Sequence, residues 1–235
     1  MMKKLGILGG MGPAASAEFV NRLIAQTPAS CDQDHIPFVL WSDPRVPDRS
    51  TSLRNKDDLP LSWLLDGIQG LKSAGCNCIV IPCNTAHFWF DEMKKQASWN
   101  SKIIHIVDSV VDALQDVNVT NSTIGIIGTQ ATIELGLYQY KLNKLGWNCI
   151  TPTKEEMDTL VQPAINLIKA NNNEAAQPLI MTVVNRLIDS GAKAVVLGCT
   201  ELPLAVKQTE EKGIPLINSI DSLVKSALIE YNKGK

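Results

Sequence analysis

The chain contains one pattern twice, an apolar run that ends on a cysteine. Residues 79–87 read IVIPCNTAH and residues 194–203 read AVVLGCTELP, so in each copy small polar residues and then a helical pattern follow the cysteine. An apolar run of this kind is typical of a strand that is buried in a parallel sheet. Ligands of open α/β sheets bind at the carboxyl ends of the strands, and we therefore expect Cys83 and Cys199 to lie at such a site.

A glycine turn is also repeated, and it precedes each cysteine by a similar distance. Gly9 is 74 positions before Cys83, and Gly128 is 71 positions before Cys199. Both glycines close a short apolar run, at residues 4–10 and 122–129. Two halves with the same features in the same order indicate an internal duplication.

Apolar runs alternate with helical patterns in both halves, which predicts an α/β protein with parallel sheets. We expect two pseudo-symmetric α/β domains with a ligand cleft between them. The first comprises residues 1–116 and 212–235, because the strand and helix at 214–228 are expected to return to it, and the second comprises residues 117–211. Further strands are expected at 36–41 and 103–107, and helices at 14–25, 61–71 and 87–96.

Composition argues against some classes of partner. The chain has 22 Lys and Arg residues against 24 Asp and Glu residues, a net charge of -2 and a pI of about 5.9. A nearly neutral chain without a basic stripe is a poor candidate for binding nucleic acid or an anionic membrane. The apolar stretch after the first methionines is too short for a signal peptide, so we expect a cytoplasmic protein.

The six cysteines do not predict disulfides or a metal site. Thiols stay reduced in the cytosol, and Cys76, Cys78 and Cys83 lack a second pair at zinc-ribbon spacing. Besides Cys83 and Cys199, we expect the cysteines to be small apolar side chains in the core. They are Cys31, Cys76, Cys78 and Cys149.

Four short motifs are spread over essentially the whole chain: GGMGP at 9–13, PDR at 47–49, CNTAH at 83–87 and GCTE at 198–201. Together they resemble the aspartate/glutamate racemase superfamily, and most of all its aspartate racemases. The resemblance implies an amino-acid racemase that needs no cofactor and no metal. It also implies a small acidic amino acid as the substrate, and a homodimer.

The resemblance assigns roles to individual residues. Cys83 and Cys199 match the two catalytic cysteines, and Arg49 and Lys169 fall where aspartate racemases hold substrate carboxylates. Two positions depart from the family pattern: Ser50 replaces a common Thr, and Asn171 replaces a common Gly. The expected substrate-binding residues are Met11, Arg49, Asn84, Thr85, Thr129, Lys169, Thr200 and Glu201.

The chemistry of racemisation accounts for a pair of thiols. A proton leaves one face of the α-carbon and another arrives at the opposite face, so an acid and a base on opposite sides are needed. Asn84, Thr85 and Thr200 are residue types that cap helices. We therefore expect each thiol to lie at a helix N-terminus, where its pKa is lowered.

Other functions fit parts of the same sequence. The racemase could accept glutamate or a broader range of amino acids. Residues 10–15 formally match the glycine-rich turn of a nicotinamide-dependent oxidoreductase, but Asp43 lies too far along the chain to be its ribose ligand. A two-lobed amino-acid binding protein would have a similar cleft but would not need two cysteines.

Overall fold

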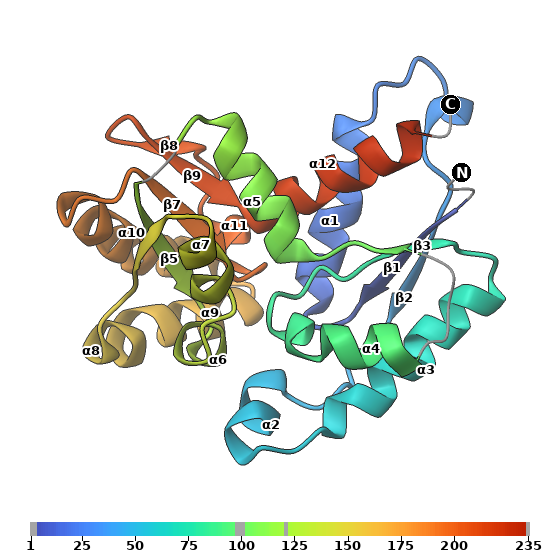
Figure 1. Cartoon of the computed structure of the whole chain (residues 1–235), viewed down its shortest axis with the longest axis horizontal. Coiled ribbons are helices and arrows are strands. Elements are labelled where there is room, and N and C mark those ends of the chain that lie inside the picture. Colours follow the sequence, from blue (N-terminus) through green and yellow to red (C-terminus); the bar gives the residue numbers. More distant parts are fainter. Residues whose placement is uncertain (1–3, 97–101, 120–121, 234–235) are drawn as a thin grey trace. The chain divides into compact units, whose positions relative to one another are not determined.

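The computed structural model describes residues 4–96, 102–119 and 122–233 of the 235-residue chain. These residues form two sheets in which nearly all strands are parallel, so the predicted α/β class is confirmed (Figure 1). The first sheet has the order β2-β1-β3-β4 and the second the order β6-β5-β7-β9-β8. The strands are β1 Leu5–Gly9, β2 Phe38–Ser42, β3 Cys78–Val80, β4 Lys102–Ile103, β5 Thr123–Gly128, β6 Asn148–Ile150, β7 Ala194–Gly198, β8 Glu210–Glu211 and β9 Ile214–Asn218.

The two sheets have the same connectivity. In each, the first strand lies between the second and the third, and a further parallel strand, β4 or β9, lies beyond the third. All of these pairs are parallel, and β8 alone among the described strands runs antiparallel to its neighbour. Every residue of β1 and β7 is buried, which explains why these strands read as unbroken apolar runs.

The chain divides into two compact units, Met1–Ser109 with Ile220–Lys235, and Val110–Ser219. Two helices cross the boundary between them. Helix α5, Ile106–Asp116, passes from the first unit into the second, and helix α12, Ser219–Asn232, passes back.

The strand at 214–218 was expected in the first domain, and that expectation was wrong. Strand β9 pairs with β7 in the second sheet, with Val195 opposite Leu216 and Leu197 opposite Asn218. It lies next to β7 as β4 lies next to β3, so it is the counterpart of β4 in the second sheet. Only α12, which follows it, belongs to the first unit.

The strand expected at 103–107 is also shorter than predicted. Strand β4 ends at Ile103, and helix α5 begins at Ile106. The ring of His105 explains the early start, because its Nδ1 accepts a hydrogen bond of 3.1 Å from the Val107 backbone N–H. A side chain that satisfies a free N–H of the first turn stabilises a helix start.

Helices cover both sheets. In the first unit, α1 (Pro13–Gln26) and α12 lie on one side of the sheet and α3 (Leu59–Ser73) lies on the other (Figure 1). In the second unit, α9 (Gln162–Lys169) and α10 (Asn173–Asp189) pack their apolar faces on β5 and β7. The remaining described helices are α2 Arg49–Asn55, α4 Phe90–Gln96, α6 Gln130–Glu134, α7 Gln139–Lys144, α8 Lys154–Glu156 and α11 Leu202–Ala205. Short helical turns are η1 Asp32–Asp34, η2 Thr85–Trp89 and η3 Met157–Val161.

The glycine turn after β1 requires glycine at Gly10. Its φ is +92°, and a Cβ there would lie 2.4 Å from the backbone of Asp43. The loop after β2 therefore packs directly on this turn. Gly191 has a similar φ of +96°, but a Cβ at that position would meet no atom within 4 Å.

We expect Gly10→Ala to lower the free energy of unfolding by about 3 kcal/mol, because it combines a strained φ with a backbone clash. Gly191→Ala should cost about 1 kcal/mol, since it adds the strained φ alone. Urea denaturation followed by circular dichroism measures both. Equal losses in the two variants would contradict the packing described for Gly10.

Candidate active site

In the first unit, Cys83 lies three residues beyond the end of β3 and is buried. Its backbone N–H donates to the carbonyl oxygen of Ile81 at 2.8 Å, which makes a tight turn at the strand end. Asn84 and Thr85 follow and are also buried. The apolar run therefore does deliver this cysteine to the carboxyl edge of the sheet.

Arg49 joins the loop after β2 to the glycine turn. Its Nη2 donates to the Met11 carbonyl at 3.3 Å, and its Nη1 donates to the carbonyls of Val46 and Pro47 at 3.2 and 3.1 Å. Met11, Val46 and Cys83 belong to one buried apolar cluster. The structure thus brings the predicted residues Met11, Arg49 and Cys83 together.

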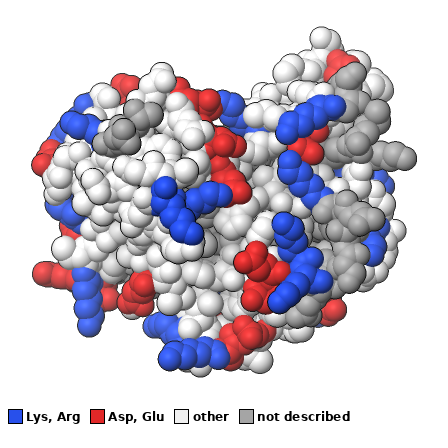
Figure 2. Space-filling model, viewed as in Figure 1, with Lys and Arg blue, Asp and Glu red and all other residues white. Residues whose placement is uncertain are grey.

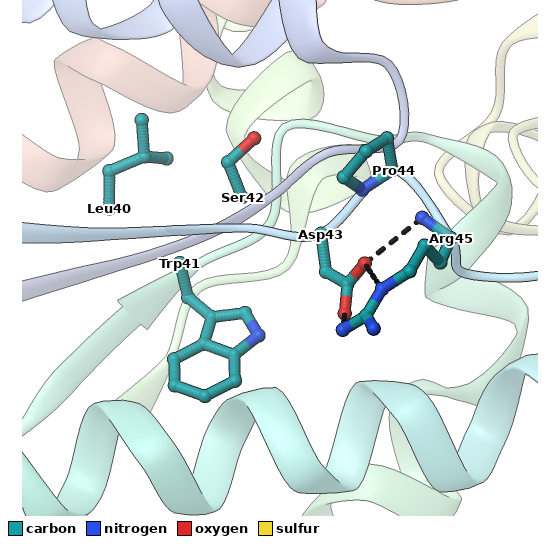
Figure 3. A pocket seen from close by; sticks show the side chains of 6 residues that line it. All are labelled: Leu40, Trp41, Ser42, Asp43, Pro44 and Arg45. Atoms are coloured by element: carbon teal, nitrogen blue, oxygen red, sulfur yellow. Dashed lines mark hydrogen bonds and ion pairs between the residues drawn. The ribbon is translucent and has the colours of Figure 1, made fainter.

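The same loop holds a second arginine with a different environment. A pocket at the carboxyl end of β2 is lined by residues 40–45 (Figure 3). Within it, Arg45 pairs with the Asp43 carboxylate through Nε at 2.9 Å and Nη2 at 2.8 Å. The Trp41 indole lies on Gly67 and Gly70 of α3. Arg45 is thus neutralised by its own loop, whereas the Arg49 guanidinium donates to backbone carbonyls.

In the second unit, Cys199 directly follows β7 and only 2 % of its surface is exposed. Its Sγ donates to Oε2 of Glu201 at 3.0 Å, and the Thr200 hydroxyl donates to the same oxygen at 3.4 Å. Glu201 is itself buried. Glu201 was predicted as a substrate-binding residue, and here its carboxylate is a direct partner of the thiol.

The expected lowering of the thiol pKa by a helix N-terminus is wrong for Cys199. Burial raises the pKa of Cys199 well above its ordinary value, and the Glu201 carboxylate raises it further. The helix that follows, α11, has only four residues, and its first turn receives no side-chain cap. Asn84 likewise gives no side-chain cap to the turn η2.

Lys169 is the last residue of α9 and is exposed. Its positive charge lowers the pKa of Cys199, against the larger effects of burial and Glu201. Asn171, just beyond, has a φ of +61°. Glycine and asparagine are the residues that most readily adopt this left-handed conformation after a helix, so Asn171 can replace the family's glycine without moving Lys169.

Thr129 leaves the second sheet at the same edge as Cys199 because of the strand register. Gly128 is opposite Gly198, so the next residue of each strand leaves the sheet at the same edge. The Thr129 side chain caps α6, accepting from the Thr132 N–H at 3.2 Å. Thr129, Lys169, Cys199, Thr200 and Glu201 therefore gather in the second unit.

Three buried side chains near the cysteines were not among the predicted site residues. They are His87, which contacts the carbonyl of Ile81, and the pair Tyr138 and Ser219, beside β7. His87 stands in a recognisable motif, but nothing in the sequence around Tyr138 or Ser219 distinguishes them from ordinary core residues.

The other cysteines differ from one another. Cys76 and Cys78 are buried as expected, and burial raises the pKa of Cys78 to about 12. Cys31 is exposed, so its prediction as a core residue was wrong: it precedes the short surface turn η1. Cys149 is half-buried, and burial raises its pKa to about 11.

Two features are absent from the described part of the chain. No group of three or more His, Cys, Asp or Glu side chains is arranged to hold a metal ion there. Within the same residues, no helix combines the length and apolar character that crossing a membrane requires. Figure 2 shows acidic and basic side chains interspersed over the face that it presents.

Comparison with known proteins identifies the class. Residues 8–227 match the model of the Asp/Glu/Hydantoin racemase family, and the chain belongs to this family. The aspartate racemase of Picrophilus torridus has a similar structure, with a TM-score of 0.84 and 33% sequence identity over 98% of this chain and 94% of that one. An aspartate racemase homologue from Pyrococcus horikoshii shares the fold, with a TM-score of 0.77 and 23% identity over 99% of this chain and all of the other.

A curated relative is also similar along its whole length. The broad specificity amino-acid racemase RacX of Bacillus subtilis is 26% identical over 97% of both chains. A glutamate racemase from Persephonella marina is 29% identical, but the match covers 74% of this chain and 64% of that protein. The chain is therefore related to racemases of more than one specificity.

The surroundings of Cys199 predict opposite effects for its two charged neighbours. Glu201→Gln should lower the pKa of Cys199, because it removes a negative charge that disfavours the thiolate, and Lys169→Met should raise it. The thiolate absorbance, titrated with pH and compared with the same variant carrying Cys199→Ser, measures both. Shifts in the same direction would be inconsistent with the arrangement described here.

Proposed function

We propose that the protein is a cofactor-independent isomerase that interconverts L- and D-aspartate by two-base proton transfer between Cys83 and Cys199. The observation that carries the proposal is the equivalence of the two cysteines. Each follows the third strand of a sheet with the same connectivity, and each is buried at the carboxyl edge. Membership of the racemase family supports the reaction class.

In this mechanism one thiolate removes the α-proton and the other thiol delivers a proton to the opposite face. The first sulfur becomes a thiol, the second becomes a thiolate, and the α-carbon is inverted. A carbanionic intermediate separates the two transfers. The hydrogen bond from Cys199 to Glu201 favours Cys199 as the thiol in the resting enzyme, because a carboxylate neighbour disfavours a second negative charge.

An acidic substrate is supported by the cations near the cysteines. The guanidinium of Arg49 lies next to Met11 in the cluster that contains Cys83, and its buried Nε has no acceptor among the described residues. Lys169 acts electrostatically on Cys199. We propose that Arg49 and Lys169 hold the substrate carboxylates, with Asn84, Thr85, Thr129 and Thr200 as further hydrogen-bonding groups.

A second candidate is a racemase of broader specificity, which is the described activity of the Bacillus subtilis relative. Chiral analysis after incubation with each L-amino acid, without added cofactor, separates the two candidates. The resemblance also implies a homodimer in the cytoplasm, and these remain predictions for sedimentation and cell fractionation to check.

Replacing either cysteine should nearly abolish racemisation. A positioned acid or base contributes roughly 10² to 10⁴-fold. Cys83→Ala and Cys199→Ala should each lose at least that much, and the double variant should be little worse, because residues that act as one unit are not additive. Each single variant should retain α-proton exchange in deuterated water with one enantiomer, and the two variants with opposite ones. Racemisation by Cys199→Ala at the wild-type rate would exclude the mechanism.

Arg49→Lys should reduce kcat/KM for aspartate by about tenfold or more, because a planar guanidinium binds a carboxylate through two parallel hydrogen bonds that an ammonium cannot reproduce. Arg45→Lys is the matched control. Arg45 lies in the same loop but pairs with Asp43 and its side chain is 75% exposed, so its replacement should leave kcat/KM nearly unchanged. Equal effects of the two substitutions would remove Arg49 from the site.

A further inference from the structure

The carbonyl group two residues before each cysteine accepts a hydrogen bond from a buried side chain. In the first unit, Nε2 of His87 lies 3.1 Å from the carbonyl oxygen of Ile81. In the second, the hydroxyl of Ser219 donates to the carbonyl of Leu197 at 2.9 Å. Equivalent backbone positions of the two halves are thus held by unlike residues.

The contact of His87 reaches the backbone of Cys83 directly. The carbonyl oxygen of Ile81 accepts both the His87 hydrogen bond and the N–H of Cys83. The imidazole is held in place by Phe90, with ring centroids 5.9 Å apart, and by His105 at 4.7 Å. A change at His87 therefore acts on the turn that carries the thiol.

His87 can serve only as a fixed donor in this position. Burial, together with the neighbouring His105, lowers the pKa of His87 to about 3, so the ring is neutral at physiological pH. Its Nε2 carries the proton that Ile81 accepts. Among the described residues its Nδ1 has no hydrogen-bond partner, so an apolar ring in its place would leave no other group unsatisfied.

Ser219 and Tyr138 hold the end of β7 from two directions. Ser219 bonds the Leu197 carbonyl, and the phenol of Tyr138 is hydrogen-bonded to Ser219. The Tyr138 ring lies on Gly198, where a Cβ would be 2.9 Å from ring carbon Cε2. Both side chains are fully buried. The backbone of Leu197 and Gly198, directly before Cys199, is therefore held in place by these two side chains.

We infer that His87 is a positioning residue for Cys83, and that Ser219, supported by Tyr138, is a positioning residue for Cys199. The inference rests on the proposed function, because it concerns how each thiol is oriented toward the α-carbon of the substrate. None of the three is assigned a proton-transfer role. Each acts on the backbone that carries a sulfur, and a small misplacement of a reacting group is costly to the rate.

The test compares His87→Phe with Ser219→Ala. Phenylalanine keeps an aromatic ring beside Phe90 and His105, and alanine removes only the hydroxyl. The readout is α-proton exchange of L- and D-aspartate in deuterated water, measured separately. We expect His87→Phe to slow exchange about tenfold or more for the enantiomer that Cys83→Ala also affects, and Ser219→Ala to do so for the opposite enantiomer.

Conservative variants separate positioning from stability. His87→Gln and Ser219→Thr retain a donor and should recover most of the lost exchange. Tyr138→Phe should slow exchange of the same enantiomer as Ser219→Ala, but by a smaller factor. Thr27→Val removes a hydroxyl that donates to the Leu23 carbonyl at 2.6 Å in α1, and should affect neither enantiomer. Equal slowing of both enantiomers by His87→Phe or Ser219→Ala would overturn the inference.

A second readout does not depend on racemase activity. The rates at which Cys83 and Cys199 react with a small alkylating reagent are measured by mass spectrometry of peptides. His87→Phe should change the rate at Cys83 alone, and Ser219→Ala the rate at Cys199 alone. If the wild type exchanged no α-proton of any amino acid, the proposed function would fail, while this pattern of reactivity would still support or overturn the positioning roles.

Discussion

The parallel pairing of buried strands is the constraint on which both halves of the structure depend. β1 pairs with β3 and β5 pairs with β7, so each glycine turn leaves its sheet at the same edge as the following cysteine. Parallel strands need long connections, and these supply the helices that bury the sheet on both faces. The register opposite Gly198 then decides which residue leaves the sheet at the same edge as Cys199: it is Thr129, 70 positions earlier in the chain.

The two thiols occupy equivalent positions in the two sheets, but their electrostatic environments differ. Cys199 is hydrogen-bonded to a buried carboxylate, whereas the residue two places after Cys83 is Thr85, which carries no charge. A raised pKa makes the thiolate of Cys199 scarcer but a stronger base once it forms, which suits the removal of a weakly acidic proton. The duplication thus preserved the scaffold, while the side chains after each strand became different.

The sequence predicted the fold class and the strands that carry the cysteines, because buried parallel strands leave a direct record in apolar runs. It did not predict that β9 joins the second sheet, since an apolar run records burial and not its neighbours. Nor did it predict the bond between Cys199 and Glu201, which depends on how the backbone turns after β7. Tyr138 and Ser219 gave no signal, because a buried tyrosine or serine has many possible partners. The internal repeat does indicate the pairing of β9, because β9 takes the same place beside β7 that β4 takes beside β3.

The path of α12 has a consequence for the synthesis of the protein. The second unit is one continuous segment, Val110–Ser219, whereas the first also requires Ile220–Lys235. Contacts such as Arg22 with Asp221 and Lys102 with Glu230 join the beginning of the chain to its last helix. Since ribosomes make proteins from the amino terminus, the half that is translated later is the first to have all of its residues, and the earlier half must wait until α12 has been made to cover its core.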